Sequence, residues 1–321
     1  MQQEIRFATF NVFNLAPPGV QLYENLAPLT HEEYEAKADW TAQQLDQLDA
    51  DVVAFQEIFS QAALRDVLSR TRKYKDAIHA GFDPDPHATR LTPNVALVSR
   101  LPLADNAMTY STLPHNLSIH LPGVAEPVTR FTRPVLHAQI VVSKNLRINI
   151  FVVHLKSKRP DLRAGESEDD QGQLSIAALR SLIRRGMEAV GLRCLLTDAM
   201  KGNGIPVVVL GDFNDIAAAV STQLVMGLGQ LCQNGRDNRL FETYRIQPRR
   251  DPLRNVGYTH VHNGTYEAVD HILVSEEFNP ASPLAIGEVL DVEYLNDHIP
   301  LRQPEASDHG AVMARIQLYG S

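Results

Sequence analysis

The sequence predicts one α/β domain spanning residues 1–321, with two stacked β-sheets and helices on their outer faces. Short apolar runs typical of strands occur in both halves of the chain, and helical patterns lie between them. No internal repeat, low-complexity tract or linker divides the chain. Of its 321 residues, 44% are hydrophobic and 21% are charged, which is ordinary for a globular protein and excludes a disordered chain.

Strand patterns recur along the whole chain. Continuous apolar runs predict strands that are buried on both faces. These runs are 51–55, 95–98, 206–210 and 272–274. Alternating apolar and polar residues predict strands with one buried face. The alternating segments are 5–10, 136–142, 146–150 and 311–318. A turn at 143–145 joins segments 136–142 and 146–150 and predicts a hairpin.

Helical patterns are fewer. Thr30 and Glu33 have the spacing of a capping box, which predicts a helix start with an apolar face toward the sheet. Ser60 is expected to cap a second helix. A third pattern runs from 174 to about 200 without proline and could break at Gly186 or Gly191. Its expected apolar face consists of Leu174, Ala178, Leu182 and Ala189.

Charge and hydropathy exclude several classes of protein. The net charge of −8 excludes strong polyanion binding by the surface as a whole, although a local basic groove stays open. No apolar run approaches the roughly 20 residues of a membrane span. No leader precedes the strand at 5–10, so we expect a cytoplasmic protein, or a secreted or periplasmic one if a leader was removed. Cys194 and Cys232 are too few for a disulfide framework and are expected to be buried free thiols.

Acids, amides and histidines gather at the ends of the predicted strands. They are Asn11, Glu57, His154, Asp212, Asn214, Asp270, Asp308 and His309. Strand ends at one edge of a sandwich can converge on one cleft, where rigid strands position the side chains. Two carboxylates and an amide suit a hard cation such as Mg²⁺, which leaves the other groups for proton transfer. Taken singly, each residue is more often a turn or surface residue. Asp297-His298, with no strand close behind it, is expected to be a surface pair without a catalytic role.

The order and residue sequence of several short motifs around these positions resemble those of the endonuclease/exonuclease/phosphatase superfamily, which has the pancreatic deoxyribonuclease fold. The matching blocks are TFNVFN at 9–14, QE at 56–57, NVALVSR at 94–100, HLKSK at 154–158, GDFN at 211–214, DHILVS at 270–275 and SDH at 307–309. The resemblance implies a four-layer α/β/β/α sandwich with two stacked mixed sheets and outer helices. It also implies hydrolysis of a phosphoester that depends on Mg²⁺ or Mn²⁺.

The resemblance implies a metal site at one side of the cleft. Glu57 is similar to the principal metal ligand, with Asn11 and Asp308 nearby to ligate or orient. Some members carry an acidic residue two positions after the first Asn, whereas this chain has Phe13 there. The departure puts a second metal position in doubt.

The resemblance also implies roles in proton transfer and phosphate binding. Asp212 is similar to the group that orients or deprotonates the attacking water, and Asn214 to the amide that holds water or a phosphate oxygen. His309 resembles the phosphate-binding histidine, with Asp270 as its carboxylate partner. His154 occupies the place of a second histidine near the leaving group.

The substrate class is the least determined part. The HLKSK wording resembles bacterial nucleases, and Lys156 and Lys158 are expected to contact substrate phosphates. A second basic run lies at 236–254. We therefore expect a nuclease acting on DNA, with RNA as an open second substrate, and little sequence specificity. A phosphatase or phospholipid phosphodiesterase, acting on an inositol phosphate or sphingomyelin, is the alternative, and an inactive binding module is the third. An expected lack of an exposed aromatic hairpin argues against sphingomyelin as the substrate. The single tryptophan, Trp40, is expected in or near the core. The oligomeric state stays open. So does the choice between exonucleolytic cleavage from strand ends and endonucleolytic cleavage within a strand.

Overall fold

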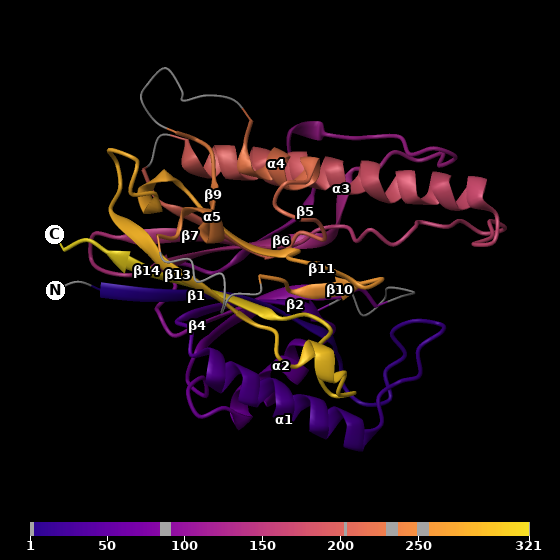
Figure 1. Cartoon of the computed structure of the whole chain (residues 1–321), viewed down its shortest axis with the longest axis horizontal. Coiled ribbons are helices and arrows are strands. Elements are labelled where there is room, and N and C mark those ends of the chain that lie inside the picture. Colours follow the sequence, from indigo (N-terminus) through magenta and orange to yellow (C-terminus); the bar gives the residue numbers. More distant parts are fainter. Residues whose placement is uncertain (1–2, 84–90, 202–203, 229–236, 249–256, 321) are drawn as a thin grey trace.

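The chain folds into two six-stranded mixed β-sheets packed face to face, with helices on both outer sides (Figure 1). This computed structural model describes residues 3–83, 91–201, 204–228, 237–248 and 257–320. Helices α1 (His31–Leu48) and α2 (Gln61–Arg70) cover one sheet, and α3 (Gln171–Met200) and α4 (Val220–Met226) cover the other. The four-layer α/β/β/α prediction is thereby confirmed.

The first sheet has the order β13-β14-β1-β2-β4-β3. Its strands are β1 (Gln3–Leu15), β2 (Val52–Ile58), β3 (Ile78–Gly81), β4 (Asn94–Ser99), β13 (Gly287–Leu295) and β14 (Ala311–Leu318). Strands β1 and β2 are parallel, and the other pairs are antiparallel. Apart from Asp51, the predicted runs 5–10, 51–55, 95–98 and 311–318 lie in these strands.

The second sheet has the order β5-β6-β7-β8-β12-β9. Its strands are β5 (Met108–Thr112), β6 (Arg130–Val141), β7 (Arg147–His154), β8 (Val207–Asp212), β9 (Phe241–Glu242) and β12 (Asp270–Val274). The predicted hairpin is β6–β7, and the parallel pair is β7–β8. Gly211 allows the latter two strands to approach, because a Cβ there would lie 2.1 Å from the carbonyl oxygen of Val153. A short α5 (Thr243–Ile246) follows β9, and a separate hairpin pairs β10 (His260–His262) with β11 (Thr265–Glu267).

Apolar side chains fill three layers between these elements. The central layer lies between the sheets and includes Phe7, Val52 and Ile150, and the outer layers lie under the helices. Trp40 is 8% exposed under α1, as expected for a residue in or near the core. The two strand-rich sheets therefore form a rigid frame for the residues at their edges.

The two predicted helix starts are confirmed. The Thr30 hydroxyl accepts a hydrogen bond from the Glu33 amide at 3.2 Å, and the Glu33 carboxylate accepts one from the Thr30 amide at 2.8 Å. Ser60 caps α2 by accepting from the Ala63 amide at 3.3 Å. Both caps satisfy amides that have no partner inside the helix.

Helix α3 differs from the prediction. It runs unbroken through Gly186 and Gly191. The predicted apolar face is wrong at Ala178 and Leu182, which are exposed, whereas Ala189 is buried as predicted. The buried face instead contains Ala177, Arg180, Ser181, Arg185, Glu188 and Leu192. Its two arginines are buried in ion pairs, Arg180 with Glu166 at 2.6 Å and Arg185 with Asp215 at 3.2 Å, and Glu188 accepts a hydrogen bond from the Lys156 backbone amide at 2.8 Å. A pattern of hydrophobicity alone cannot find such a face.

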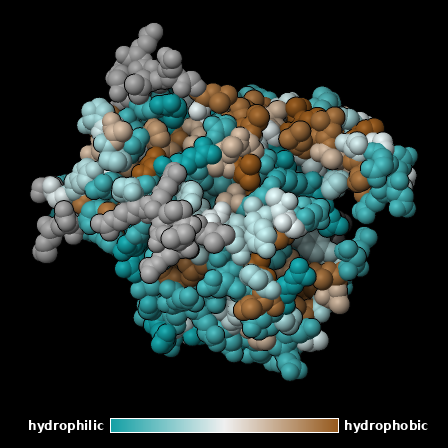
Figure 2. Space-filling model, viewed as in Figure 1, coloured by the Kyte–Doolittle hydropathy of each residue, from teal (hydrophilic) through white to brown (hydrophobic). Residues whose placement is uncertain are grey.

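The outer surface of α3 and α4 carries several exposed apolar side chains, which Figure 2 shows as brown residues along that edge. They include Ile176, Leu179, Leu182, Val220 and Leu228. No helix in the described residues is both long and apolar enough to cross a membrane. Cys194 is free and half-buried rather than buried, and Cys232 lies outside the described residues.

Candidate active site

The predicted site residues meet at one edge of the two sheets. In the second sheet, Asp212 at the end of β8 pairs with His154 of β7 on one side and with Asp270 of β12 on the other. In the first sheet, Asn11 of β1 pairs with Gln56, the neighbour of Glu57 in β2. The strand ends of the two sheets converge here, because the Asn11 side chain contacts both Glu57 and Asp212.

His309 and Asp270 form the most buried charged pair of this edge. The Nδ1 atom of His309 lies 2.8 Å from Oδ2 of Asp270, and the two side chains are 9% and 0% exposed. Burial alone would lower the pKa of His309, but the charges of Asp270 and Asp212 raise it well above its usual value. Since Asp270 occupies Nδ1, Nε2 is the nitrogen that can donate to a bound anion.

Asp212 lies beside this pair and accepts hydrogen bonds from several directions. Its Oδ1 accepts from the Asn214 amide at 2.7 Å, and its Oδ2 accepts from the side-chain amides of Asn214 at 3.1 Å and Asn11 at 3.2 Å. Burial and the nearby charge of Asp270 raise the pKa of Asp212 to about 7. A carboxylate with this pKa can exchange a proton near neutral pH.

His154 holds Asp212 from the third side. Its Nε2 lies 3.3 Å from Oδ2 of Asp212, and its buried Nδ1 has no hydrogen-bond partner among the described residues. Burial and the charges of Arg133 and His309 lower the pKa of His154 well below its usual value. We infer that His154 is neutral and orients Asp212 by donating from Nε2.

Glu57 lies at the other side of Asn11 and is less buried. Its Oε1 accepts from the Asn11 side-chain amide at 3.3 Å, and its Oε2 accepts from the Asn14 amide at 3.0 Å. The pairing of β2 with β4 shifts register here, and Glu57 has a left-handed backbone with φ of 64°. This bulge turns the Glu57 carboxylate toward the site instead of along the sheet.

The donor set around Glu57 fits a divalent cation. The Asn11 amide bonds to both Glu57 and Asp212, so two carboxylates face each other across one amide. After burial and the charge of Asp270, the charge of Glu57 also contributes to the raised pKa of Asp212. Oxygen donors with excess negative charge are what Mg²⁺ and Mn²⁺ bind. Glu57 would hold such a cation through its carboxylate, and Asn11, whose NH2 faces Glu57 and whose Oδ1 accepts from the Phe13 amide, would orient that carboxylate.

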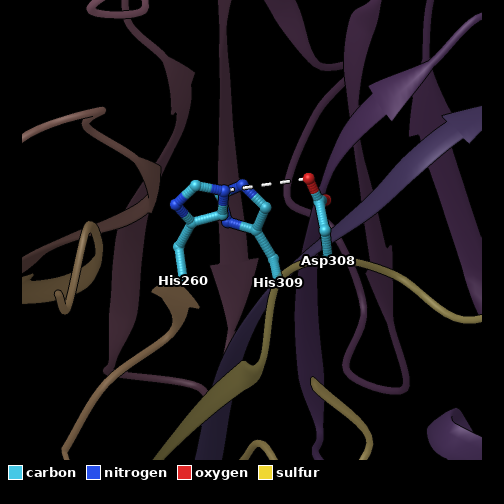
Figure 3. A group of neighbouring side chains, drawn as sticks. All are labelled: His260, Asp308 and His309. Atoms are coloured by element: carbon cyan, nitrogen blue, oxygen red, sulfur yellow. Dashed lines mark ion pairs between the residues drawn. The ribbon is translucent and has the colours of Figure 1, made fainter. Parts of the chain in front are cut away.

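Asp308 lies farther out and faces His260 (Figure 3). Its side chain is 48% exposed, and its Oδ2 lies 3.7 Å from Nε2 of His260. The His260 and His309 rings lie against each other with centroids 4.7 Å apart. Ser307 fixes this segment, since its hydroxyl donates to the Asn11 carbonyl at 2.6 Å and accepts from the His309 amide at 3.0 Å.

Sequence reasoning missed His260. It comes from the β10–β11 hairpin, whose Asn263-Gly264 turn has positive φ at both residues. The dipeptide Asn-Gly between alternating segments is a strong hairpin signal and could have placed His260 beside the site. The hairpin also carries Tyr266, which is 61% exposed. The expectation of no exposed aromatic hairpin is therefore wrong, and it no longer argues against sphingomyelin as a substrate.

Lys37 on α1 was also missed. It is only 3% exposed, and burial lowers its pKa to about 8 against the opposing charges of Glu57, Asp308 and Glu305. Its Nζ lies 5.6 Å from the centroid of the Phe13 ring. The signal was present in the sequence, because a lysine at 37 interrupts the apolar stripe that follows Thr30.

The two predicted phosphate-binding lysines already have partners. Lys156 Nζ donates to the carbonyl oxygens of Ser157 at 3.2 Å and Arg159 at 3.0 Å. Lys158 Nζ contacts Glu267 at 2.9 Å and Asp215 at 3.4 Å. In the second basic run, Arg239 and Arg245 pair with Asp237 and Glu242, and Arg236, Arg249, Arg250 and Arg254 lie outside the described residues.

The prediction that Asp297-His298 is a surface pair is wrong for the histidine. His298 is 7% exposed, and its Nε2 lies 2.9 Å from the carbonyl oxygen of His309. Its ring meets Trp40 edge-on, with centroids 5.0 Å apart. His298 therefore supports the segment that holds His309.

Comparisons with known proteins agree with this fold. The model of the endonuclease/exonuclease/phosphatase family matches residues 8–309. A member of that family from Bacteroides thetaiotaomicron is similar at a TM-score of 0.60 and 15% identity, covering 99% of this chain and 96% of its own. No curated protein matches. The chain belongs to the endonuclease/exonuclease/phosphatase family, whose members hydrolyse phosphoester bonds.

Two further solved structures have the same fold. The human Nocturnin catalytic domain with a bound sulfate anion has a TM-score of 0.59 and 17% identity, covering 98% of this chain and 95% of its own. A mannosyl-6-phosphatase of Bacteroides thetaiotaomicron has a TM-score of 0.58 and 16% identity, covering 97% and 99%. At these identities the likeness shows the fold alone.

Proposed function

We propose that the protein is a divalent-metal-dependent phosphodiesterase, and that its substrate is DNA, with RNA as a second candidate and little sequence preference. The observation that carries the proposal is the buried group of Asp212, Asp270 and His309, whose ligand atoms lie within 4.8 Å of one another. In this group the carboxylate of Asp212 can accept a proton beside the positively charged His309. Phosphoester hydrolysis needs both a proton acceptor and a positive charge.

One group of residues acts on the attacking water, and another binds the phosphate. Asp212 accepts a proton from the attacking water, and Asn214, Asn11 and His154 hold its carboxylate in place. His309 donates from Nε2 to a phosphate oxygen, and Asp270 keeps it positively charged. Glu57, with Asn11 and Asp308 nearby, would hold a divalent metal ion, which when bound would supply Lewis-acid stabilisation of the phosphate charge.

The second candidate is a phosphatase acting on a phosphomonoester, and a specific observation favours it. Lys156 and Lys158 are bonded to carbonyl or carboxylate oxygens, so the expected basic groove would need these contacts to open before it could bind a long polyanion. A phosphomonoester needs only the central site. One protein of the same fold is a mannosyl-6-phosphatase. Sphingomyelin or an inositol phosphate stays a third choice.

A substrate panel with a matched variant tests the proposal. Plasmid, single-stranded DNA, RNA, a sugar phosphate, an inositol phosphate and a choline phosphodiester are each incubated with Mg²⁺ and with Mn²⁺. We expect nucleic acid to be cleaved, chelator to abolish cleavage, and Asp212→Asn to lower turnover by roughly 10²–10⁴-fold with the fold intact. Lys158→Ala should flatten the log–log salt slope by about one unit if this lysine meets a phosphate. Nucleic acid that survives while a monoester is hydrolysed would establish the second candidate.

A further inference from the structure

Lys37 is a buried cation that the proposed mechanism leaves without a role. On α1 it lies three residues after Tyr34 and four before Thr41, among the positions that face the sheet. Lys37 is only 3% exposed. A lysine in such a position is rare unless its charge is paired, because removing an ammonium group from water is costly.

The surroundings of Lys37 contain negative charges but no direct partner. Within the residues that the structure describes, no carboxylate lies within 4.0 Å of its Nζ and no hydrogen bond from Nζ is formed. The carboxylates whose charges act on it are Glu57, Asp308 and Glu305. The first two are the residues expected to serve the metal. The ammonium group thus lies on the Glu57 side of the active site. The carboxylate charges act on it there, but none of them forms an ion pair with it.

The neighbour of Lys37 at the rim of the site is aromatic. The ring of Phe13 lies 5.6 Å from Nζ, within the range of a cation–π contact, and Phe13 is 38% exposed. The ring does not neutralise the charge, and it holds the lysine side chain along one wall. The amide of Phe13 in turn donates to the Asn11 side chain at 3.1 Å, which ties this wall to the centre of the site.

We propose that Lys37 is a phosphate-binding residue, which donates to a phosphate oxygen of the substrate on the Glu57 side while His309 does so on the Asp270 side. The inference rests on the proposed function in that the substrate carries a phosphate, and it does not depend on which phosphoester is cleaved. A phosphate entering between the two cations would give Lys37 the anionic partner that it lacks within the described residues. Charge-assisted bonds of ammonium to phosphate are among the stronger hydrogen bonds in proteins.

The test is the binding of inorganic phosphate to the full chain, with Mn²⁺ present, for wild type, Lys37→Met and a control. Lys37→Met removes the charge and keeps an unbranched side chain that can pack in the same space. Lys73→Met is the matched control, because Lys73 is 38% exposed and pairs at 3.0 Å with Asp49, the residue that caps the C-terminal end of α1. We expect phosphate to bind Lys37→Met about 10- to 100-fold more weakly than wild type, and Lys73→Met like wild type.

Two further measurements separate phosphate binding from a structural role. Removing an unpaired buried charge should leave the urea midpoint of Lys37→Met equal to or higher than that of wild type. Removing a positive charge beside Glu57 should leave Mn²⁺ affinity, followed by electron paramagnetic resonance, equal or tighter. Equal phosphate affinity in wild type and Lys37→Met would overturn the proposal. So would a joint loss of stability, Mn²⁺ affinity and phosphate affinity, or a wild-type protein that binds no phosphate.

These outcomes are independent of the substrate panel. If nucleic acid survives and Lys37→Met still loses phosphate affinity, the nuclease assignment fails and the role of Lys37 stands. If nucleic acid is cleaved and Lys37→Met binds phosphate normally, the nuclease assignment stands and the role of Lys37 fails.

Discussion

Asp297-His298 and Asp308-His309 have the same two residues eleven positions apart, and the structure uses them differently. Both histidines are 7% exposed, so burial does not distinguish them. His298 contacts the main-chain oxygen of His309 and the Trp40 ring, whereas His309 contacts the carboxylate of Asp270. Only the second histidine has a charged partner on the imidazole.

The neighbouring aspartate is not the partner of the histidine in either pair. Asp297 is exposed, and Asp308 faces His260. The partner of His309 is Asp270, 39 residues away in sequence and brought in by β12. The local Asp-His pattern therefore says little, and the long-range contact decides which histidine is charged.

The largest expected difference between the two pairs is in catalysis. His309→Ala removes the cation that we propose faces the phosphate, and it should lower turnover on the best substrate by roughly 10²–10⁴-fold. His298→Ala should lower it less than about 10-fold, because His298 acts only through the backbone of His309. Steady-state kinetics at saturating Mg²⁺ measure both. A greater loss in His298→Ala than in His309→Ala would reverse the roles of the two pairs.

Much of this comparison could be predicted from sequence, and the missing part has a physical cause. Strand-end positions placed His154, Asp212 and Asp270 on one sheet edge, because neighbouring strands bring their ends together. The burial of His298 could not be predicted in the same way. It depends on the contact with Trp40, which comes from a helix more than 250 residues earlier in the chain.

Apolar periodicity missed buried charged residues on both α3 and α1, although the apolar face predicted after Thr30 is buried on α1. The buried face of α3 holds Arg185 and Glu188, and the buried face of α1 holds Lys37. Periodicity can place a charged residue such as Lys37 on a buried face, but it does not supply the contact that explains such burial, for example the ion pair of Arg185 with Asp215. Functional and ion-paired positions are therefore where sequence patterns fail first.

The second difference is in stability, where His298 should matter more than a surface residue. His298→Ala removes a ring that packs against Trp40 and leaves the carbonyl oxygen of His309 without this donor. We expect a loss of about 1–3 kcal/mol in the free energy of unfolding. Urea unfolding measures it, with Asp297→Ala as the control, which should stay within about 0.5 kcal/mol. A His298→Ala protein as stable as that control would restore the view of a surface histidine.

The smallest and most specific difference is in the response of stability to pH. Burial lowers the pKa of His298. Its contribution to stability is therefore present above about pH 6.5, the unfolded pKa, and is lost as pH falls through the lowered folded pKa. For His309, burial alone would lower the pKa, but Asp270 raises it well above the usual value. Its contribution is therefore full below about pH 6.5 and is lost as pH rises through the raised folded pKa.

The two alanine variants should consequently respond to pH in opposite directions. In chelator, the destabilisation caused by His298→Ala should be larger at about pH 8 than at about pH 5.5, and that caused by His309→Ala should be larger at about pH 5.5. Urea unfolding of wild type and both variants at the two pH values gives the comparison directly. Parallel responses would mean that Asp270 does not keep His309 charged, because only the charge on His309 makes the two buried histidines differ in sign.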